Sequence, residues 1–336
     1  MLPLPPFRLH TPSSLTEALA LLERYGPDVV LVAGGTDLLP NMKRGLLAPA
    51  HVVSLREVRG LGALSLDEGE LRIGAMASLD AVSAWPVARA EARALAQAAA
   101  AVGGPQHRRM GTLGGNLCLD TRCRYYNQSA FWRGALGGCL KKDGAECHVV
   151  GGGRRCVAAA SNDTAAAVIA LDASLDLVSA RGARTLPARA FYTADGTANT
   201  VREPGEVLVA VRVPRRAGRS SVYEKLRRRG AIDFPLLSVA ASVEVTAGVV
   251  TAFELVVSAL AARPHRLTGA AAHVVAKAPR EVSREAVARL AHKGCVPLDN
   301  IEGDAAWRRA MVPVLVERAL RRLGLGAGVS SDADRT

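Results

Sequence analysis

This chain of 336 residues lacks the features of a secreted, membrane-spanning or nucleic-acid-binding protein. Its first residues, MLPLPPFRLH, contain neither the charged start nor the continuous apolar segment of a secretion signal. No uncharged apolar run approaches the roughly 18 residues that suggest a membrane span. Aromatic residues, on which nucleic-acid bases would stack, make up only 4% of the chain. We therefore expect a soluble, cytoplasmic protein that binds neither membranes nor nucleic acid.

Lysine is also scarce, because only 6 of the 43 basic residues are Lys. Basic residues outnumber the 31 acidic ones and give a formal net charge of +12. They are spread along the chain in short groups, such as Arg108-Arg109 and Arg215-Arg216, instead of forming one long stretch. A scattered charge of this kind is a weak nucleic-acid signal. It favours an acidic docking partner or an anionic cofactor.

The pattern of apolar residues predicts helices and strands in mixed order, in a chain long enough for two or three domains. Ser14 and Glu17 are spaced to cap the first helix. We expect helices over residues 15–22, 87–102, 280–292 and 305–323, a short helix followed by a strand from residue 164, and strands over residues 28–33, 51–55, 71–76, 206–214, 236–245 and 249–259. Residues 215–221 are expected to be a linker, and Ala247-Gly248 a hairpin turn.

Two glycine loops, Ala33–Asp37 and Thr112–Asn116, are candidates for binding an anion. Glycine allows the backbone to approach a ligand closely, so that consecutive N–H groups form a concave anion site. Neither loop has the spacing of the dinucleotide-binding or P-loop motifs. Each loop taken alone is equally well explained as a tight turn after a strand.

Cysteine is concentrated in one segment, since five of the six cysteines lie between Cys118 and Cys156. In a reducing compartment this indicates metal or redox chemistry instead of disulfides. Four of the five, separated by 16, 8 and 9 residues, have the number needed for a [4Fe–4S] cluster: Cys123, Cys139, Cys147 and Cys156. Zinc bound by these four, or by three of them with His148, fits the spacing as well. Free buried thiols are a third reading, and Cys118 is the expected spare thiol.

The remaining polar candidates are individually weak. Asp163, in the sequence Ser161-Asn162-Asp163, is placed either to cap a helix or to bind a ribose or ribityl hydroxyl. Lys225 is placed either on the solvated surface or near a flavin ring. No Ser-His-Asp triad or paired-carboxylate site is visible, so we expect no catalytic residue in this chain.

Several motifs in order resemble the FAD-binding medium subunits of the xanthine dehydrogenase and carbon monoxide dehydrogenase family of molybdenum hydroxylases. The motifs are LVAGGTDLLPNMK, RRMGTLGGNL, SND, EVLVAVRVP and YEKLRRR. The resemblance implies an α+β fold: a two-part FAD-binding domain of the vanillyl-alcohol oxidase (PCMH) type, then a carbon monoxide dehydrogenase flavoprotein-like C-terminal domain of sheet and helices. The implied boundaries are residues 1–216, with an iron–sulfur loop insertion at 120–160, residues 220–325, and a disordered tail at 326–336.

The cysteine segment itself resembles the β subunits of 4-hydroxybenzoyl-CoA reductases. That resemblance implies a [4Fe–4S] cluster, in preference to zinc, on Cys123, Cys139, Cys147 and Cys156. The family resemblance also implies a set of FAD contacts. They are Leu31, Val32, Ala33, Gly34, Gly35, Thr36, Asp37, Leu38, Val102, Thr112, Leu113, Gly114, Gly115, Asn116, Arg124, Asp163, Leu208 and Lys225. One departure is that TAAAVIAL follows Asp163 where relatives often have a proline.

The implied function is electron transfer within a larger enzyme. The partners would be a molybdopterin-binding large subunit and a [2Fe–2S] small subunit, in a dimer of heterotrimers, with ferredoxin as electron donor. Electrons would pass from ferredoxin through [4Fe–4S], FAD and [2Fe–2S] to molybdenum, where the aromatic hydroxyl of the thioester is removed. An alternative is a hydroxylase that oxidises a purine, aldehyde or heteroaromatic compound, with electrons leaving through this chain. A non-redox, zinc-stabilised binding module is a third reading.

Overall fold

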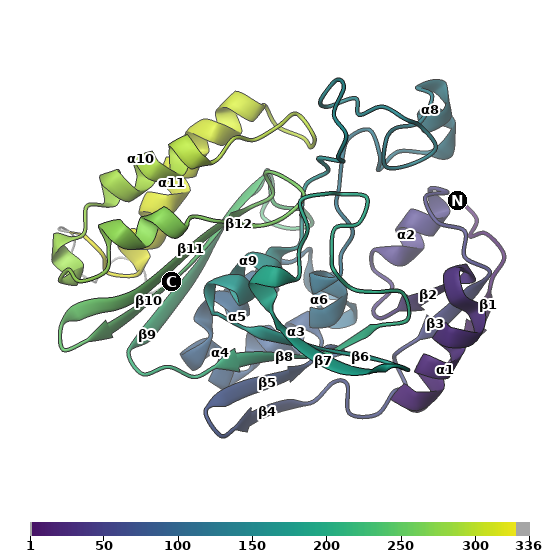
Figure 1. Cartoon of the computed structure of the whole chain (residues 1–336), viewed down its shortest axis with the longest axis horizontal. Coiled ribbons are helices and arrows are strands. Elements are labelled where there is room, and N and C mark those ends of the chain that lie inside the picture. Colours follow the sequence, from purple (N-terminus) through teal and green to yellow (C-terminus); the bar gives the residue numbers. More distant parts are fainter. Residues whose placement is uncertain (1, 327–336) are drawn as a thin grey trace.

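The computed structural model describes residues 2–326, which form three sheets with helices packed against them (Figure 1). The expected disordered tail, residues 326–336, lies outside the described residues except for Gly326. None of the helices within residues 2–326 is long and apolar enough to cross a membrane.

The first sheet is parallel, and its strand order is β1-β3-β2. Its strands are β1 (Arg8–His10), β2 (Val29–Val32) and β3 (His51–Ser54). Helix α1 (Leu15–Tyr25) makes the crossover that parallel strands require. The predicted cap is present, because the Glu17 N–H donates to Ser14 Oγ at 3.2 Å. Helix α2 (Leu38–Lys43) follows the first glycine loop.

The second sheet has five strands in the order β4-β5-β8-β6-β7, and all its pairings are antiparallel. The strands are β4 (Leu64–Asp67), β5 (Glu70–Gly74), β6 (Ser174–Ser179), β7 (Gly182–Pro187) and β8 (Val207–Pro214). Strand β8, predicted from its alternating pattern, lies at the centre. Most of its successive residues are buried, so both of its faces are covered.

Helices between the second and third sheets complete one apolar core. They are α3 (Leu79–Ala84), α4 (Pro86–Glu91), α5 (Arg93–Ala101), α6 (Pro105–Met110), α7 (Leu113–Leu117) and α9 (Asp163–Ala170). The single helix expected over residues 87–102 is wrong, because Ala92 leaves the helical conformation at φ −136° and ψ 48°. The Ala94 N–H there donates to Ser221 Oγ, a partner from the third sheet, at 3.0 Å.

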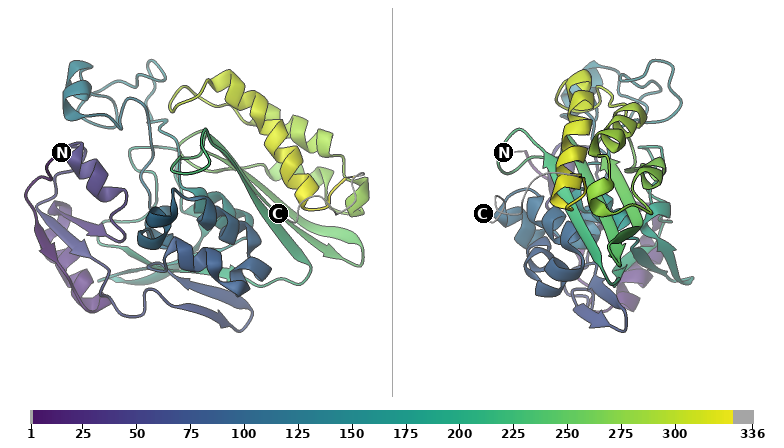
Figure 2. Two further views of the ribbon diagram at one scale, coloured as in Figure 1. Left: turned by 180° about the vertical axis from the view of Figure 1, so that it is seen from behind. Right: turned by 90° about the vertical axis from the view of Figure 1, so that its left-hand side faces the viewer.

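The third sheet, in the C-terminal part, has the order β12-β11-β10-β9. Its strands are β9 (Arg219–Leu226), β10 (Leu237–Thr246), β11 (Val249–Ser258) and β12 (His265–Arg266). Helices α10 (Arg284–Gly294) and α11 (Ala305–Arg322) cover one face, as both views in Figure 2 show. The Ala247-Gly248 turn is confirmed, since both residues have positive φ. The expected linker over residues 215–221 is too long, because β9 already pairs with β10 from Arg219.

A long segment between α7 and α9 carries the cysteines, and we call residues 118–160 the cysteine loop. It contains one short helix, α8 (Ala130–Ala135), where the sequence indicated no regular structure. The side chain of Arg133 is buried and donates to the backbone carbonyls of Arg44, at 3.3 Å, and Gly45, at 3.0 Å. These bonds attach α8 beside α2, on the same side of the molecule in Figures 1 and 2.

Candidate functional site

A cavity of about 650 Å³ lies where the parallel sheet, strand β8 and the start of α9 meet. The two glycine loops are far apart in sequence, but both are in its wall. Residues from α6, β8 and the loop after β9 complete the wall. The predicted contacts that line it are Leu31, Ala33, Gly34, Gly35, Thr36, Asp37, Leu38, Val102, Thr112, Gly114, Gly115, Asn116, Asp163 and Leu208.

The first glycine loop runs from β2 to α2 along the cavity. A Cβ at Gly34 would lie 2.0 Å from the backbone oxygen of Met110, so only glycine fits there. Gly35 has a φ of +72°, which side chains seldom adopt. Behind the loop, Asn41 is buried and its Oδ1 accepts no hydrogen bond from the described residues. Because Asn41 also lines the cavity, it offers an acceptor to a ligand with hydroxyl or N–H groups.

The second glycine loop leads into α7, whose start is capped by Thr112. The Gly115 N–H donates to Thr112 Oγ1 at 3.0 Å. At Gly114 a Cβ would lie 2.6 Å from the Cβ of Ala75, so the loop also depends on close backbone packing. The side-chain oxygen of Asn116 accepts a bond of 2.6 Å from Thr164 Oγ1, which ties this loop to α9. Both loops are therefore tight turns, as the simpler reading held, and both also line the cavity.

Asp163 is the first residue of α9 and is buried in the cavity wall. Its carboxylate accepts from the Tyr223 hydroxyl at 2.6 Å and lies 2.9 Å from Lys225 Nζ. Lys225 also donates to the Ala101 carbonyl at 2.9 Å. Burial raises the pKa of Asp163 and lowers that of Lys225, and the attraction between the two opposes both shifts. The preceding Asn162 occupies the cap position without a capping side-chain bond.

Four predicted FAD contacts lie outside the cavity wall: Val32, Leu113, Arg124 and Lys225. Lys225 contacts the wall residue Asp163, which lies 2.9 Å from its ammonium. Leu113 is fully buried in the core. Arg124 is exposed, and its backbone N–H donates to the Asn300 carbonyl at 2.7 Å.

Sequence reasoning missed several polar wall residues, of which Arg122 is the most informative. Its guanidinium lies 3.0 Å from the Asp37 carboxylate and 4.0 Å from the centre of the Phe234 ring. Burial raises the pKa of Asp37, and the Arg122 charge counteracts that rise. The only sequence signal for Arg122 is its position beside Cys123. The other polar wall residues outside the predicted contacts include Arg44, His107, Cys118, Asp120, Arg202 and Asp233.

The cysteine loop brings the predicted cluster ligands into one neighbourhood. Cys123 and Cys156 pack in one apolar cluster with Tyr126. Burial is the main cause that raises the pKa of the Cys123 thiol to about 11, and charges on Cys156 and Cys139 contribute to the rise. Cys147 and Cys139 act in the same way on Cys156. Cys123, Cys139 and Cys156 are buried, and Cys147 is partly exposed.

The other two cysteines are elsewhere. Cys118 lines the cavity, and Cys295 is buried in the apolar core of the C-terminal domain. Across residues 2–326, no three His, Cys, Asp or Glu side chains converge closely enough to hold a single metal ion. The His148 ring is engaged with the Gly138 carbonyl at 2.6 Å.

Comparison with known families covers nearly the whole chain. Residues 5–216 match the FAD binding domain in molybdopterin dehydrogenase, and residues 221–323 match the CO dehydrogenase flavoprotein C-terminal domain. The chain is 30% identical over 317 residues to the carbon monoxide dehydrogenase medium chain of Hydrogenophaga pseudoflava, covering 94% of this chain and 96% of that one. It is 33% identical over 249 residues to the aldehyde oxidoreductase FAD-binding subunit of Escherichia coli K12, covering 70% and 76%.

A solved structure of the Hydrogenophaga pseudoflava carbon monoxide dehydrogenase has a chain with the same fold. The TM-score is 0.78 at 29% identity, with 95% of this chain and 97% of that chain covered. The predicted α+β fold, with an FAD-binding domain followed by a carbon monoxide dehydrogenase flavoprotein-like domain, is thereby confirmed. This protein belongs to the FAD-binding medium subunits of the carbon monoxide dehydrogenase and xanthine dehydrogenase family of molybdenum hydroxylases.

Proposed function

We propose that this chain is the FAD- and [4Fe–4S]-carrying electron-transfer subunit of a 4-hydroxybenzoyl-CoA reductase-like molybdenum enzyme. The observation that carries the proposal is the continuity between the cavity and the cysteine loop. Asp120 and Arg122 line the cavity, and the next residue, Cys123, packs with Cys156. Two redox groups held this close together suit electron transfer.

The cavity fits FAD in size and in chemistry. Its volume lies within the range of about 300–1,000 Å³ that is usual for ligand sites. The backbone N–H groups of the glycine loops would hold the pyrophosphate. Asp163 and the free acceptor of Asn41 would bind hydroxyl or N–H groups. FAD exchanges either one or two electrons, so its protein site can connect one-electron and two-electron partners.

The cysteine loop offers a set of donors suited to an iron–sulfur cluster. Cys123, Cys139 and Cys156 are buried, and the Ala158 N–H donates to Cys156 Sγ at 3.5 Å. Bonds of this kind to the sulfurs tune iron–sulfur centres. Each thiolate of a [4Fe–4S] cluster binds a different iron, so the four sulfurs need not approach one shared ion. The cluster would be enclosed by Tyr126 and Leu46, which limit its contact with water.

We infer partners from the names of the relatives, which are medium chains and FAD-binding subunits. A molybdopterin-binding large subunit and a [2Fe–2S] small subunit would complete the complex, as a dimer of heterotrimers. Reduced ferredoxin would donate electrons at the cysteine loop. In this arrangement the chain binds and insulates the redox groups, and the aromatic substrate lies on another subunit.

The alternative function is an FAD subunit of a hydroxylase, with electrons leaving through this chain. It is favoured by relatives named as carbon monoxide dehydrogenase and aldehyde oxidoreductase. The purified complex should be assayed with 4-hydroxybenzoyl-CoA and reduced ferredoxin, and separately with xanthine and an aldehyde plus an electron acceptor. Turnover only in the second assay would overturn the reductase proposal and leave the flavin subunit in place.

Metal analysis tests the cluster directly. The chain purified without oxygen should contain about four irons, and a broad absorption near 400 nm should underlie the flavin bands. Single Cys→Ser changes at Cys123, Cys139, Cys147 and Cys156 should remove the iron, whereas the same change at Cys295 should not. A protein that contains zinc and no iron would support the binding-module reading instead.

A further inference from the structure

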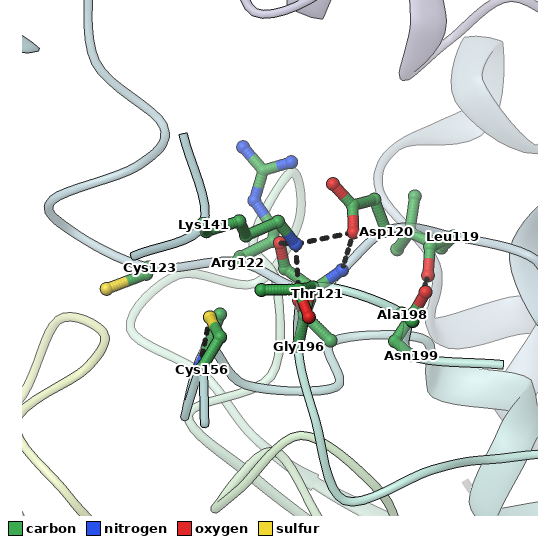
Figure 3. A network of polar contacts seen from close by, with 12 residues as sticks. Leu119, Asp120, Thr121, Arg122, Cys123, Lys141, Cys156, Gly196, Ala198 and Asn199 are labelled. Carbon is green, nitrogen blue, oxygen red and sulfur yellow. Dashed lines mark hydrogen bonds and ion pairs between the residues drawn. The ribbon is translucent and has the colours of Figure 1, made fainter. Parts of the chain in front are cut away.

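A lysine of the cysteine loop is buried between the cavity wall and the cysteines. The side chain of Lys141 is only 6% exposed, which is unusual for lysine. Its ammonium lies 2.6 Å from Asp120 Oδ1 and 2.6 Å from Thr121 Oγ1. It also lies 4.5 Å from the centre of the Tyr126 ring, a cation–π distance. Figure 3 shows that Lys141 reaches across to Asp120 and Thr121 from a separate stretch of the chain.

The same network reaches the backbone at Cys156. The Thr121 hydroxyl, which accepts from Lys141, donates to the Gly196 carbonyl at 3.1 Å. The Gly196 N–H in turn donates to the Cys156 carbonyl at 2.8 Å. A Cβ on Gly196 would lie 2.8 Å from Cys156 Sγ and 3.0 Å from Thr121 Oγ1. Because residue 196 is glycine, the Cys156 thiol and the Thr121 hydroxyl can both lie against it. Figure 3 shows the three residues together.

The balance of charge in this network is uneven. Asp120 is 39% exposed at its side chain, so water screens its negative charge. The Lys141 ammonium is shielded from water, and an unscreened charge acts more strongly on its neighbours. The Tyr126 ring, over which this ammonium lies, packs in the same apolar cluster as Cys123 and Cys156. The network therefore places a shielded positive charge, with a more exposed negative partner, beside these two cysteines.

We propose that Lys141 is a positioning residue that raises the reduction potential of the redox centre held by Cys123, Cys139, Cys147 and Cys156. Reduction adds one negative charge to that centre, and a buried cation beside it stabilises the added charge. This inference rests on the proposed cluster. Lys141 would thus help to set the reduction potential of the cluster from within the cysteine loop, between the cluster ligands and the cavity.

The test is an electron paramagnetic resonance redox titration of the intact complex purified without oxygen. We expect Lys141→Met to retain its iron and to lower the equilibrium constant for reducing the cluster about tenfold, which equals about 59 mV for a one-electron couple. Lys141→Arg, which keeps the charge, should stay near the wild type. The matched control is Lys142→Met, since that neighbouring lysine is 37% exposed and pairs with Asp143 at 3.3 Å.

Asp120→Asn provides a second, independent measurement, because it removes the negative partner of Lys141 and should raise the potential. Unchanged potentials in both Lys141→Met and Asp120→Asn, with iron retained, would overturn the inference and leave the cluster assignment intact. Loss of iron from Lys141→Met together with an unchanged potential in Asp120→Asn would make Lys141 a structural residue and also overturn it. A wild-type complex without iron would instead refute the proposed function.

Discussion

The wall of the cavity includes two glycine loops at the ends of regular elements, whereas the cysteine loop contains one short helix and is attached by side chains. In the wall, Gly34 and Gly114 are in positions where a Cβ would collide with neighbouring atoms. Arg133 of the loop bonds to the Gly45 carbonyl, and Asn300 from outside the loop bonds to the Val157 carbonyl. Lys141 joins two stretches of the loop itself. The cavity should therefore be sensitive to added volume, and the loop to lost hydrogen bonds.

The largest effect is expected from Gly34→Ala. Its Cβ would lie 2.0 Å from the Met110 backbone oxygen, so the loop would have to move away from α6. Overpacking usually costs about 1–3 kcal/mol, and more where backbone must shift. We expect complete loss of flavin absorbance with iron retained. Gly62→Ala is the control, because the nearest atom to its Cβ, outside the neighbouring residues, would be the Met76 backbone oxygen at 3.9 Å. Flavin retained by Gly34→Ala would show that the wall tolerates added volume.

Lys225→Met should have the next largest effect, because it leaves the Asp163 carboxylate buried without its cation. Breaking a buried ion pair from one side costs about 3–5 kcal/mol, whereas replacing both partners is often nearly neutral. Urea unfolding of the full chain should thus show a large loss for Lys225→Met and a smaller one for Asp163→Asn/Lys225→Met. Equal losses in the two variants would indicate that the pair itself contributes little.

The same pair predicts a pH dependence. Burial raises the pKa of Asp163 above its ordinary value of 3.8, so folding favours the protonated carboxyl. A carboxyl whose pKa is higher in the folded chain stabilises the fold at low pH. This stability is lost as the pH rises through the folded-state pKa. Without the opposing Lys225 charge this effect becomes stronger. The stability deficit of Lys225→Met should therefore shrink as the pH is lowered towards 3.8, and a constant deficit would contradict this account.

A smaller effect, confined to the cysteine loop, is expected from Asn300→Ala. The Asn300 amide donates to the Val157 carbonyl at 2.6 Å, next to Cys156, and to the Leu260 carbonyl at 3.2 Å. Leaving buried acceptors unpaired costs about 1–3 kcal/mol. We expect reduced iron content with normal flavin content, the reverse of Gly34→Ala. The control is Glu302→Ala, an exposed neighbour. If Asn300→Ala lost iron and flavin together, the cysteine loop and the cavity wall would not be independent of each other.

The smallest effect is expected from Glu206→Gln, at the edge of the cavity. Hydrogen bonds from Arg184, at 2.6 Å and 2.7 Å, hold the pKa of Glu206 below its usual 4.5. A carboxyl whose pKa is lower in the folded chain stabilises the fold at pH values above its usual pKa. This stability is lost as the pH falls through the folded-state pKa. Because Arg184 is half exposed, the contribution should be under about 1 kcal/mol. The melting temperatures of variant and wild type should differ at pH 7 and converge below pH 4.5.

The contrast between the two regions also explains which predictions from sequence were accurate. Strands β8 and β10 and helices α1 and α11 lie close to their expected bounds, because local apolar patterns determine which residues are buried. Strand β9 was read partly as a linker, since its buried residues, such as Val222 and Tyr223, contribute no clear alternation. The alanine-rich helix divides at Ala92, where a bond to Ser221 of the third sheet replaces a helical one.

The amino-acid sequence by itself determined the two glycine loops, the group of cysteines and the family, because each depends on residues close together in the chain. Only the tertiary structure decided which polar groups meet. Asp37 pairs with Arg122, Asp163 with Lys225, and Asn300 supports the backbone beside Cys156. These contacts join residues from separate elements, and local patterns carry no information about which elements will pack together. Their effect on charge and burial therefore becomes visible only when the chain is folded.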